Sequence, residues 1–377
     1  MKKTILFAST ILATAPALAA QSSESWSDIE EKAKGQTVYF NAWGGSQNIN
    51  SYISWAATTI KDQYGVTLKH VKVSDIAETT NRLVAEKAAG KVNGGSVDMV
   101  WINGENFKSM KSNGLLHGPF TEQLPNWSNV DMSLPVTEDF TEPTNGLEAP
   151  WGVGQLVFVH DTKKLNNPPA SFAELLSLAK AFPGKVTYPK PPQFHGSSFL
   201  KAALLELTSD TAPLYKPVDQ SRFETVTAPL WAYLDSLHPV AWREGKQFPA
   251  SGPKTLQLLD DGELLLGIAF NPNAAEAGIE NGTLAPTTRT IAFEKGALSN
   301  VHFLAIPFNA NAKEGALVTI NFMLSQQAQA HKAKNSVWGD PAVVKIKNAK
   351  SLFKSQPEPH PSWQVALEQA WLKRYGK

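Results

Sequence analysis

The first part of the chain alternates between two hydrophobic patterns. A β-branched and aromatic run at 37–42 predicts a strand. The residues after it place apolar side chains on one face of a helix that stops at Gly65. The same alternation continues, with strands predicted at 66–73 and 97–104 and helices at 76–89 and 105–116. Alternating strands and helices are typical of an α/β fold with a parallel sheet.

Two glycine-bearing turns follow the first and third of these strands. Ligands of open α/β sheets bind beyond the carboxyl ends of the strands, so we expect both turns on one rim. Glycine lets a ligand approach the backbone closely, and the helix that follows offers free N–H groups. The candidate ligand-binding residues on this rim are Trp43, Gly44, Gly45, Ser46, Asn103, Glu105 and Asn106. Trp101, inside an apolar strand, is expected in the core.

The second half of the chain predicts a further α/β unit after an irregular stretch at 119–149. Ser171 and Glu174 stand three residues apart before an apolar run, which is the pattern of a helix capping box. Strands are predicted at 155–159 and 303–307 and near 270, and helices at 197–207 and 313–332. With 377 residues, 42% of them hydrophobic, the chain is long enough for two domains with cores of their own.

The N-terminus has the three parts of a secretory leader. Lys2 and Lys3 precede an apolar run from Ile5 to Leu12, and a small-residue cleavage pattern ends at Ala19. The apolar run is shorter than the roughly 18 to 20 residues that a membrane span needs. We therefore expect 1–19 to be a cleaved signal peptide. The chain has no cysteine, which excludes disulfides and a lipid-attached N-terminal Cys, so a free periplasmic protein is expected.

The charge balance argues against nucleic acid as a partner. The chain has 35 Lys and Arg against 34 Asp and Glu, and removal of Lys2 and Lys3 leaves it nearly neutral. Nucleic acids are bound through basic patches. The 11 tryptophans are a high count. Most are expected in the cores, while some should face a ligand, because aromatic rings supply a large rigid contact area.

Five stretches occur in an order that resembles an extracellular solute-binding protein of an ABC importer. They are TVYFNAWGG, VDMVWINGENFKSMKSNGLL, APWGVGQLVFVHDTKKLNNPPASFAELL, GELLLGIAFNPNAAEAG and VHFLAIPFNANAKEGALVTINFMLS. With the leader, they are similar to the family 1, type II periplasmic kind and to its YnjB-like subgroup. The resemblance implies two lobes, each a mainly parallel sheet flanked by helices, with a ligand cleft between them. It also implies a hinge of two or three crossing segments and separate permease and ATPase partners. We expect a monomer.

The expected lobes follow from the same order of stretches. Lobe one is expected at 26–148 plus 271–308, and lobe two at 151–268 plus 312–377. Trp151 lies near the expected first crossing, and Phe270 and Asn271 near the second, so all three are candidate cleft residues. Tyr188 and Trp338 are candidates from the second lobe.

Enzymatic motifs are missing from the sequence. It contains no G-x-S-x-G elbow, no H-E-x-x-H pair and no G-x-x-x-x-G-K-[ST] loop. Gly152 and Gly154 begin a dinucleotide-like pattern, but Val157 replaces the third glycine. We therefore expect no catalytic residue, cofactor or metal, and a solvated helix end at Asp260-Asp261. A secreted enzyme such as a carbohydrate lyase stays an alternative, and a turnover assay would distinguish it from a binding protein. A scaffold or chaperone is a further alternative.

The candidate residues favour a cationic or heteroaromatic solute. Cations gain from ring faces and from a carboxylate such as Glu105, so a thiamine-like or polyamine-like compound is the first hypothesis. A sugar is the alternative, because aromatic rings also stack on sugar faces. An inorganic anion is third, since it suits the helix N-terminus after Ser46. Iron is disfavoured, because no cluster of Tyr, His and carboxylates occurs at the candidate positions.

Overall fold

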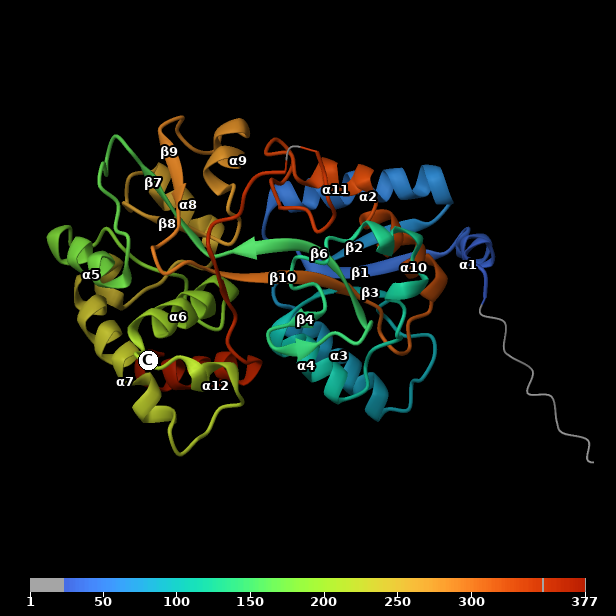
Figure 1. The fold of residues 1–377 in the computed structure, drawn as a ribbon, viewed down its shortest axis with the longest axis horizontal. Helices are drawn as coiled ribbons and strands as arrows, with labels where there is room; N and C mark the ends of the chain where they lie inside the picture. Colours follow the sequence, from blue (N-terminus) through green and yellow to red (C-terminus); the bar gives the residue numbers. More distant parts are fainter. Residues whose placement is uncertain (1–23, 348, 377) are drawn as a thin grey trace, which may run out of the picture.

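Two α/β lobes lie side by side in the computed structural model, which describes residues 24–347 and 349–376 (Figure 1). The predicted signal peptide at 1–19 lies outside the described residues. Helix α1 (Trp26–Ala33) starts the described chain next to the first lobe. Five short 3₁₀ helices lie in the connections: Thr121–Gln123, Pro125–Asn129, Ala212–Tyr215, His238–Val240 and Trp242–Gly245.

The first lobe contains a six-stranded sheet. Its parallel part consists of β1 (Thr37–Trp43) between β2 (Thr67–Val73) and β3 (Met99–Ile102). Strand β10 (Ala297–Ala305) pairs antiparallel with β3 and β6 (Glu148–Gln155), and parallel with β11 (Ser355–Pro357). A short hairpin of β4 (Glu138–Asp139) and β5 (Glu142–Pro143) lies beside it. The helices of this lobe are α2 (Gln47–Tyr64), α3 (Ile76–Ala88), α4 (Gly104–Ser112), α10 (Lys313–Met323) and α11 (Gln326–Lys332).

The predicted pattern of the first unit is confirmed. Helix α2 buries Ile49, Tyr52, Ile53, Ala56 and Ile60, which form one apolar stripe. Gly65 ends this helix in the left-handed conformation, with φ of 71°, where glycine has no Cβ to strain. Strand β1 buries Val38, Phe40 and Ala42, as a strand covered by helices does. The local sequence therefore determines where the strand ends and α2 begins.

The second lobe contains a smaller sheet with a different pairing. Strand β7 (Val157–Asp161) lies between β8 (Gly267–Ala269) and β9 (Thr288–Ile291) and is antiparallel to both. The expected parallel sheet is therefore present in the first lobe, whereas in the second lobe β7 enters between two strands that run the other way. The helices here are α5 (Phe172–Ala181), α6 (Phe194–Leu207), α7 (Phe223–Leu237), α8 (Gly252–Asp260), α9 (Ala274–Glu280) and α12 (Pro361–Tyr375). Ser171 caps α5 as predicted, with its Oγ 3.1 Å from the Glu174 nitrogen.

The lobe boundaries differ from the expected ones at two places. Helices α10 and α11, expected in the second lobe, contribute Leu317 and Ile320, among others, to the core of the first lobe. Only α12 of the segment 312–377 packs into the second core, through Trp363, Leu367 and Trp371. Strand β9, expected in the first lobe, pairs with β7 of the second. Helices α10 and α11 belong to the first lobe because the chain returns to the second lobe only at a third crossing, between β11 and α12. Strand β9 belongs to the second lobe because the second crossing runs from β9 into β10 and does not lie near 270.

Gln155 joins the three crossing segments. It is fully buried at the end of β6, where the chain passes into β7. Its Nε2 lies 2.8 Å from Ser299 Oγ in β10 and 3.1 Å from the Phe353 carbonyl oxygen before β11. Its Oε1 accepts a hydrogen bond from the Phe353 nitrogen at 2.9 Å. One side chain therefore holds together the segments about which the lobes would move.

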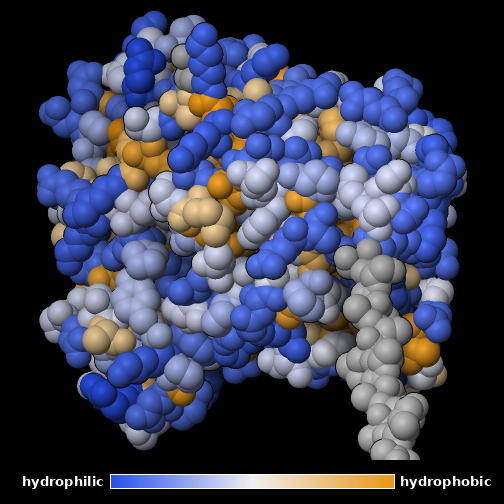
Figure 2. Space-filling model, turned by 45° about the vertical axis from the view of Figure 1, so that its right-hand side comes forward, coloured by the Kyte–Doolittle hydropathy of each residue, from blue (hydrophilic) through white to orange (hydrophobic). Residues whose placement is uncertain are grey.

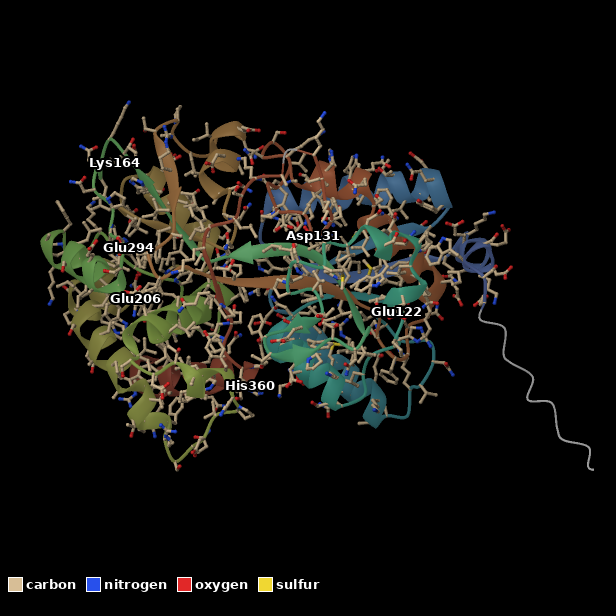
Figure 3. All side chains as sticks on the ribbon, viewed as in Figure 1. Glu122, Asp131, Lys164, Glu206, Glu294 and His360 are labelled. Atoms are coloured by element: carbon tan, nitrogen blue, oxygen red, sulfur yellow. The ribbon has the colours of Figure 1, made fainter. Side chains whose placement is uncertain are left out.

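Figure 2 shows a mainly hydrophilic face, on which hydrophobic residues form small separate patches. In the described part of the chain, none of the helices combines the length and apolarity that crossing a membrane requires. Side chains of both lobes project into the space between the ribbons, and His360 lies at the junction of the lobes, with its Nε2 3.1 Å from Lys108 Nζ of α4 (Figure 3).

Candidate functional site

A cavity of about 750 Å³ lies between the lobes. The first lobe contributes the start of α2, the turn after β2, the end of β3, two residues of β10, and Trp338 and Asp340. The second lobe contributes the start of α6, helix α8, the end of β8 and helix α9. Both lobes therefore form its wall, as expected for a cleft that encloses a ligand.

Nine of the candidate ligand-binding residues line this cavity. Strands β1 and β3 are parallel neighbours, with Phe40 opposite Met99, so the turns that follow them share one rim. The predicted proximity of Trp43 and Glu105 is therefore confirmed, whereas ligand contact stays a prediction. The nine residues are Trp43, Gly45, Ser46, Asn103, Glu105, Asn106, Phe270, Asn271 and Trp338. Trp338 reaches the cavity from the first lobe and not from the second, because it packs on the first core.

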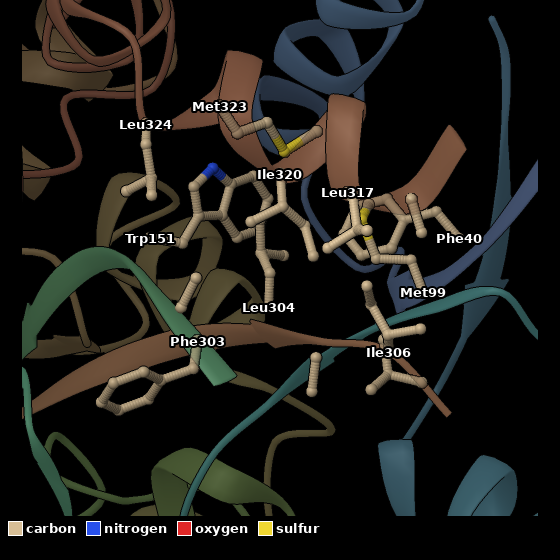
Figure 4. Packing of buried hydrophobic residues seen from close by; sticks show 14 of the residues in the cluster. Phe40, Met99, Trp151, Phe303, Leu304, Ile306, Leu317, Ile320, Met323 and Leu324 are labelled. Atoms are coloured by element: carbon tan, nitrogen blue, oxygen red, sulfur yellow. The ribbon is translucent and has the colours of Figure 1, made fainter. Parts of the chain in front are cut away.

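Three candidates lie away from the cavity lining. Gly44 donates its N–H to the Val73 carbonyl at 3.2 Å and packs on Lys72, so it serves the strand end. Trp151 is fully buried in the first core, where Ile320, Met323 and Leu324 surround its indole (Figure 4). Tyr188 is fully buried in the second core. Its hydroxyl lies 2.8 Å from His238 Nε2 and accepts the indole N–H of Trp371 at 2.7 Å.

Sequence reasoning missed several residues that line the cavity. Trp101, expected in the core, is half-buried and lines it. Asp75 follows β2, so the same strand-end rule could have found it. Asn300 and His302 are polar residues inside the apolar strand β10, which was a usable signal. The other missed lining residues with polar or aromatic side chains include Phe194, His195, Asp260, Asp261, Asp340 and Gln364.

Aromatic rings form much of the wall. Trp101 and Trp338 meet edge to face, with ring centroids 5.7 Å apart. The ring of His302 stacks on Trp338 at 5.7 Å and lies 5.2 Å from Trp101. On the second lobe, Phe194 meets Phe270 edge to face at 4.9 Å. Such rings offer flat faces to a planar or positively charged group.

Glu105 brings a carboxyl group to the rim at the start of α4. Its Oε1 accepts a hydrogen bond from Asn106 Nδ2 at 2.8 Å. Burial raises the pKa of Glu105 to about 8; Lys201 counteracts this, and the charge of Glu368 adds to it. Lys201 is itself fully buried and ion-paired with Glu358 at 2.8 Å. The carboxyl groups around Lys201 therefore outnumber the one positive charge that it supplies.

A second charged group lies beneath the aromatic wall. Asp340 forms a buried ion pair with Lys332, and its carboxylate oxygens lie 3.1 and 3.2 Å from His302 Nε2. Burial opposes the charge of Asp340, but Lys332 and His302 outweigh it and lower the pKa of Asp340. Burial lowers the pKa of His302. Gly152 makes this cluster possible, because a side chain there would overlap with Asp340 and His302.

The charged lining of the cavity is acidic. Five carboxyl groups line it, from Asp75, Glu105, Asp260, Asp261 and Asp340. Within the ranges 24–347 and 349–376, no lysine or arginine is among the lining residues. Burial lowers the pKa of His195 to about 4, so this lining histidine is neutral at pH 7. Among the described side chains, no group of three or more His, Asp or Glu is arranged to hold a metal ion.

Comparison with known proteins gives one family and one fold. The family described as bacterial extracellular solute-binding protein matches residues 55–358. Protein YnjB of Escherichia coli (strain K12) is 47% identical over 367 residues, covering 94% of this chain and 95% of that protein.

Two solved structures show the fold. The periplasmic binding protein AfuA from Actinobacillus pleuropneumoniae, with exogenous fructose-6-phosphate bound, has a TM-score of 0.67 at 16% identity over 91% of this chain and 99% of its own. A periplasmic thiamin binding protein has a TM-score of 0.65 at 17% identity over 90% and 95%. At this identity the two structures support the fold alone. The two-lobed type II periplasmic binding fold predicted from the sequence is confirmed.

Proposed function

Because the chain belongs to the bacterial extracellular solute-binding protein family, whose members serve ABC importers, we propose that its interlobe cavity captures an organic cation. One observation carries this proposal: five carboxyl groups line the cavity, of which only Asp340 is paired with a buried lysine, Lys332, and no lysine or arginine of the described residues is among the lining residues. Burial raises the pKa of Glu105 to about 8, and a positive charge beside it would stabilise the ionised carboxylate and gain Coulomb energy in a site of low dielectric. It would also gain from the ring faces of Trp43 and Trp101.

The cation is heteroaromatic, in the manner of thiamine, or a polyamine. The thiamin binding protein with this fold carries the first ligand in its name. A sugar phosphate, bound by AfuA, fits less well, because phosphate groups are normally held by Arg, Lys or helix N-termini. A neutral sugar is the alternative, since Asn103 and Asn106 lie beside the aromatic rings.

The importer context supplies the location and the partners. We expect cleavage of the leader at 1–19, release into the periplasm, and delivery of the solute to a permease driven by a separate ATPase. The protein is expected to act as a monomer, without nucleic acid and without turning over its solute. Genes for a permease and an ATPase beside the gene for this chain would support this assignment.

Isothermal titration calorimetry with four solutes tests the proposal. Spermidine and thiamine represent the two cation classes, glucose the neutral sugar, and fructose-6-phosphate the anion. We expect binding of at least one cation and none of the anion. Binding of fructose-6-phosphate or glucose with no response to either cation would contradict the proposal. Each solute is recovered after incubation, and chemical change of the bound solute would point to an enzyme instead.

A further inference from the structure

His195 brings an imidazole ring to the cavity from the second lobe. It follows Phe194 at the start of α6 and lies opposite Trp43 of the first lobe, with ring centroids 6.3 Å apart. A side chain at Gly252 would overlap with the Cδ2–Nε2 edge of this ring, so the ring packs directly on the start of α8. The position of the ring is therefore set by contacts within the second lobe.

Gln193 determines which nitrogen of His195 carries the proton. The backbone N–H of His195 can only donate, so the atom of the Gln193 amide that lies 2.9 Å from it is the accepting Oε1. The amide nitrogen of Gln193 then faces His195 Nδ1 at 3.0 Å. Because this amide nitrogen can only donate, Nδ1 has to be the unprotonated, accepting nitrogen. A neutral imidazole carries one proton, which therefore lies on Nε2 of His195.

The same contact keeps His195 neutral. A positively charged imidazole would carry a proton on both nitrogens, and the proton on Nδ1 would meet the donating amide of Gln193. Burial lowers the pKa of His195 to about 4, which agrees with this geometry. His195 therefore stays a neutral donor throughout the pH range in which Glu105 ionises.

The Nε2–H group of His195 is available to a solute. Within the described residues this nitrogen makes no hydrogen bond, yet it is not among the side-chain atoms that are both buried and without a partner. It therefore keeps accessible surface, in a residue that lines the cavity. A donor that loses water without gaining an acceptor is costly, so a solute that supplies an acceptor is favoured. The carboxyl groups of the lining would repel a negatively charged acceptor, so an uncharged one fits.

We infer that His195 is a specificity-determining residue, whose Nε2–H donates a hydrogen bond to an uncharged acceptor, such as an aromatic ring nitrogen or a carbonyl oxygen, on the cationic solute. The positive part of the same solute lies at Glu105 of the first lobe, so the solute connects the two lobes. A polyamine with every nitrogen protonated has no acceptor, and it is excluded as the solute that the cavity prefers. This inference rests on the proposed cation-binding function and makes it more specific.

Matched quaternary cations test the inference on the full chain without its leader, at pH 9, where Glu105 is ionised. Trimethyl(pyridin-3-ylmethyl)ammonium and its pyridin-4-yl isomer carry an uncharged ring nitrogen. Benzyltrimethylammonium has the same charge and a ring of the same shape without that acceptor. Calorimetry on the unaltered protein should show at least one pyridyl probe binding about tenfold more tightly than the benzyl probe, the value of one net hydrogen bond.

The variant His195→Phe keeps an aromatic ring and removes the donor, so it should bind the pyridyl and benzyl probes equally. The control is His331→Phe, because His331 stacks on Trp55 in the first lobe and does not line the cavity. This control should retain the tenfold preference. Circular dichroism establishes that both variants fold. Nitrogen-15 NMR of the unaltered protein gives a second measurement that needs no variant, and it should find the ring proton of His195 on Nε2.

The outcomes separate the inference from the function on which it rests. Equal affinities of the pyridyl and benzyl probes for the unaltered protein, or a ring proton on Nδ1, would overturn the role of His195 even if His195→Phe failed to fold. A preference that survives in a folded His195→Phe protein would overturn it as well. Binding of spermidine with no binding of any aromatic probe would overturn the inference but leave cation capture standing. No binding of the aromatic probes or of spermidine would overturn the proposed function itself.

Discussion

Trp43 of the first lobe and His195 of the second lobe face each other across the cavity, with ring centroids 6.3 Å apart. His195 is neutral at pH 7, so the contact is one of two uncharged rings. Because the two rings belong to different lobes, opening of the cleft has to separate them. The contact between the two rings is therefore a feature of the closed cleft, and the lobes would move apart about the crossing segments that meet at Gln155.

Solute binding should compact the protein, because a hinge joins the lobes and the cavity lies between them. We expect small-angle X-ray scattering to give a smaller radius of gyration with a saturating cation from the binding panel. An unchanged radius at saturation would contradict closure of the cleft.

The variant Trp43→Ala removes a ring from the cavity wall and should weaken cation binding, measured by calorimetry, by about 1–2 kcal/mol while leaving the fold intact.

At pH 9, where the Glu105 carboxyl with its pKa of about 8 is ionised, Glu105→Gln should weaken cation binding by about 1.5–3 kcal/mol, because it removes the charge partner at the rim. This corresponds to a roughly 10- to 150-fold rise in the dissociation constant measured by calorimetry. The control is Glu122→Gln, which makes the same change at an exposed position of the first lobe (Figure 3). Unchanged affinity in a folded Glu105→Gln protein would return this turn to a merely structural role.

Cation affinity should rise with pH between 6 and 9. The pKa of Glu105 is raised to about 8, so the carboxyl is mostly protonated at pH 6 and attracts a cation only as it ionises. Benzyltrimethylammonium is the suitable probe, since its own charge does not change with pH. Its affinity should increase by up to about tenfold per pH unit below 8 and then level off.

The groups around Glu105 set the limits of this pH test. Lys201 faces it from the second lobe, and Asp75 and Glu368 add negative charge. Burial raises the pKa of Glu368 as well, so this group contributes in the same direction. Burial lowers the pKa of His195 to about 4, so His195 stays neutral in this range, and burial also lowers the pKa of His302. Glu105→Gln should flatten the profile, and a profile that is flat in the unaltered protein would contradict the role of Glu105.

Trp151 belongs to the core and not to the site, which gives a stability prediction. Trp151→Ala should lower the free energy of unfolding by about 3–5 kcal/mol, the usual cost of truncating a buried large aromatic residue. Trp43→Ala, at a half-buried rim position, should cost less. Urea denaturation followed by circular dichroism measures both. Equal losses in the two variants would contradict the assignment of one residue to the core and the other to the cavity.

The sequence predicted those features of the fold that local patterns determine. Apolar periodicity located β1 and α2, and the rule that ligands bind at strand ends placed Trp43 and Glu105 on one rim. The first inference needs only the residues of one strand, one turn and one helix, and the second adds only that β1 and β3 run parallel in the same sheet.

The predictions that the structure did not support concern packing between segments that are distant in the sequence. Trp151 and Tyr188 are aromatic residues near a crossing or a turn, and sequence alone does not say whether such a ring faces a cleft or a core. Helices α10 and α11 have apolar faces, but these do not indicate which of two sheets they cover. His302 was missed because its place at the cavity wall, beside Asp340 and Trp338, arises only when segments far apart along the chain meet in the folded protein.

The central claim is that the cavity captures an organic cation at Glu105. Native mass spectrometry of the protein purified from its own host tests it most directly, because it identifies the solute that co-purifies. We expect a small molecule that carries positive charge at pH 7, present on the unaltered protein and on Glu122→Gln and lost or strongly reduced on Glu105→Gln. A sugar, a sugar phosphate or another anion retained equally by all three proteins would contradict the claim.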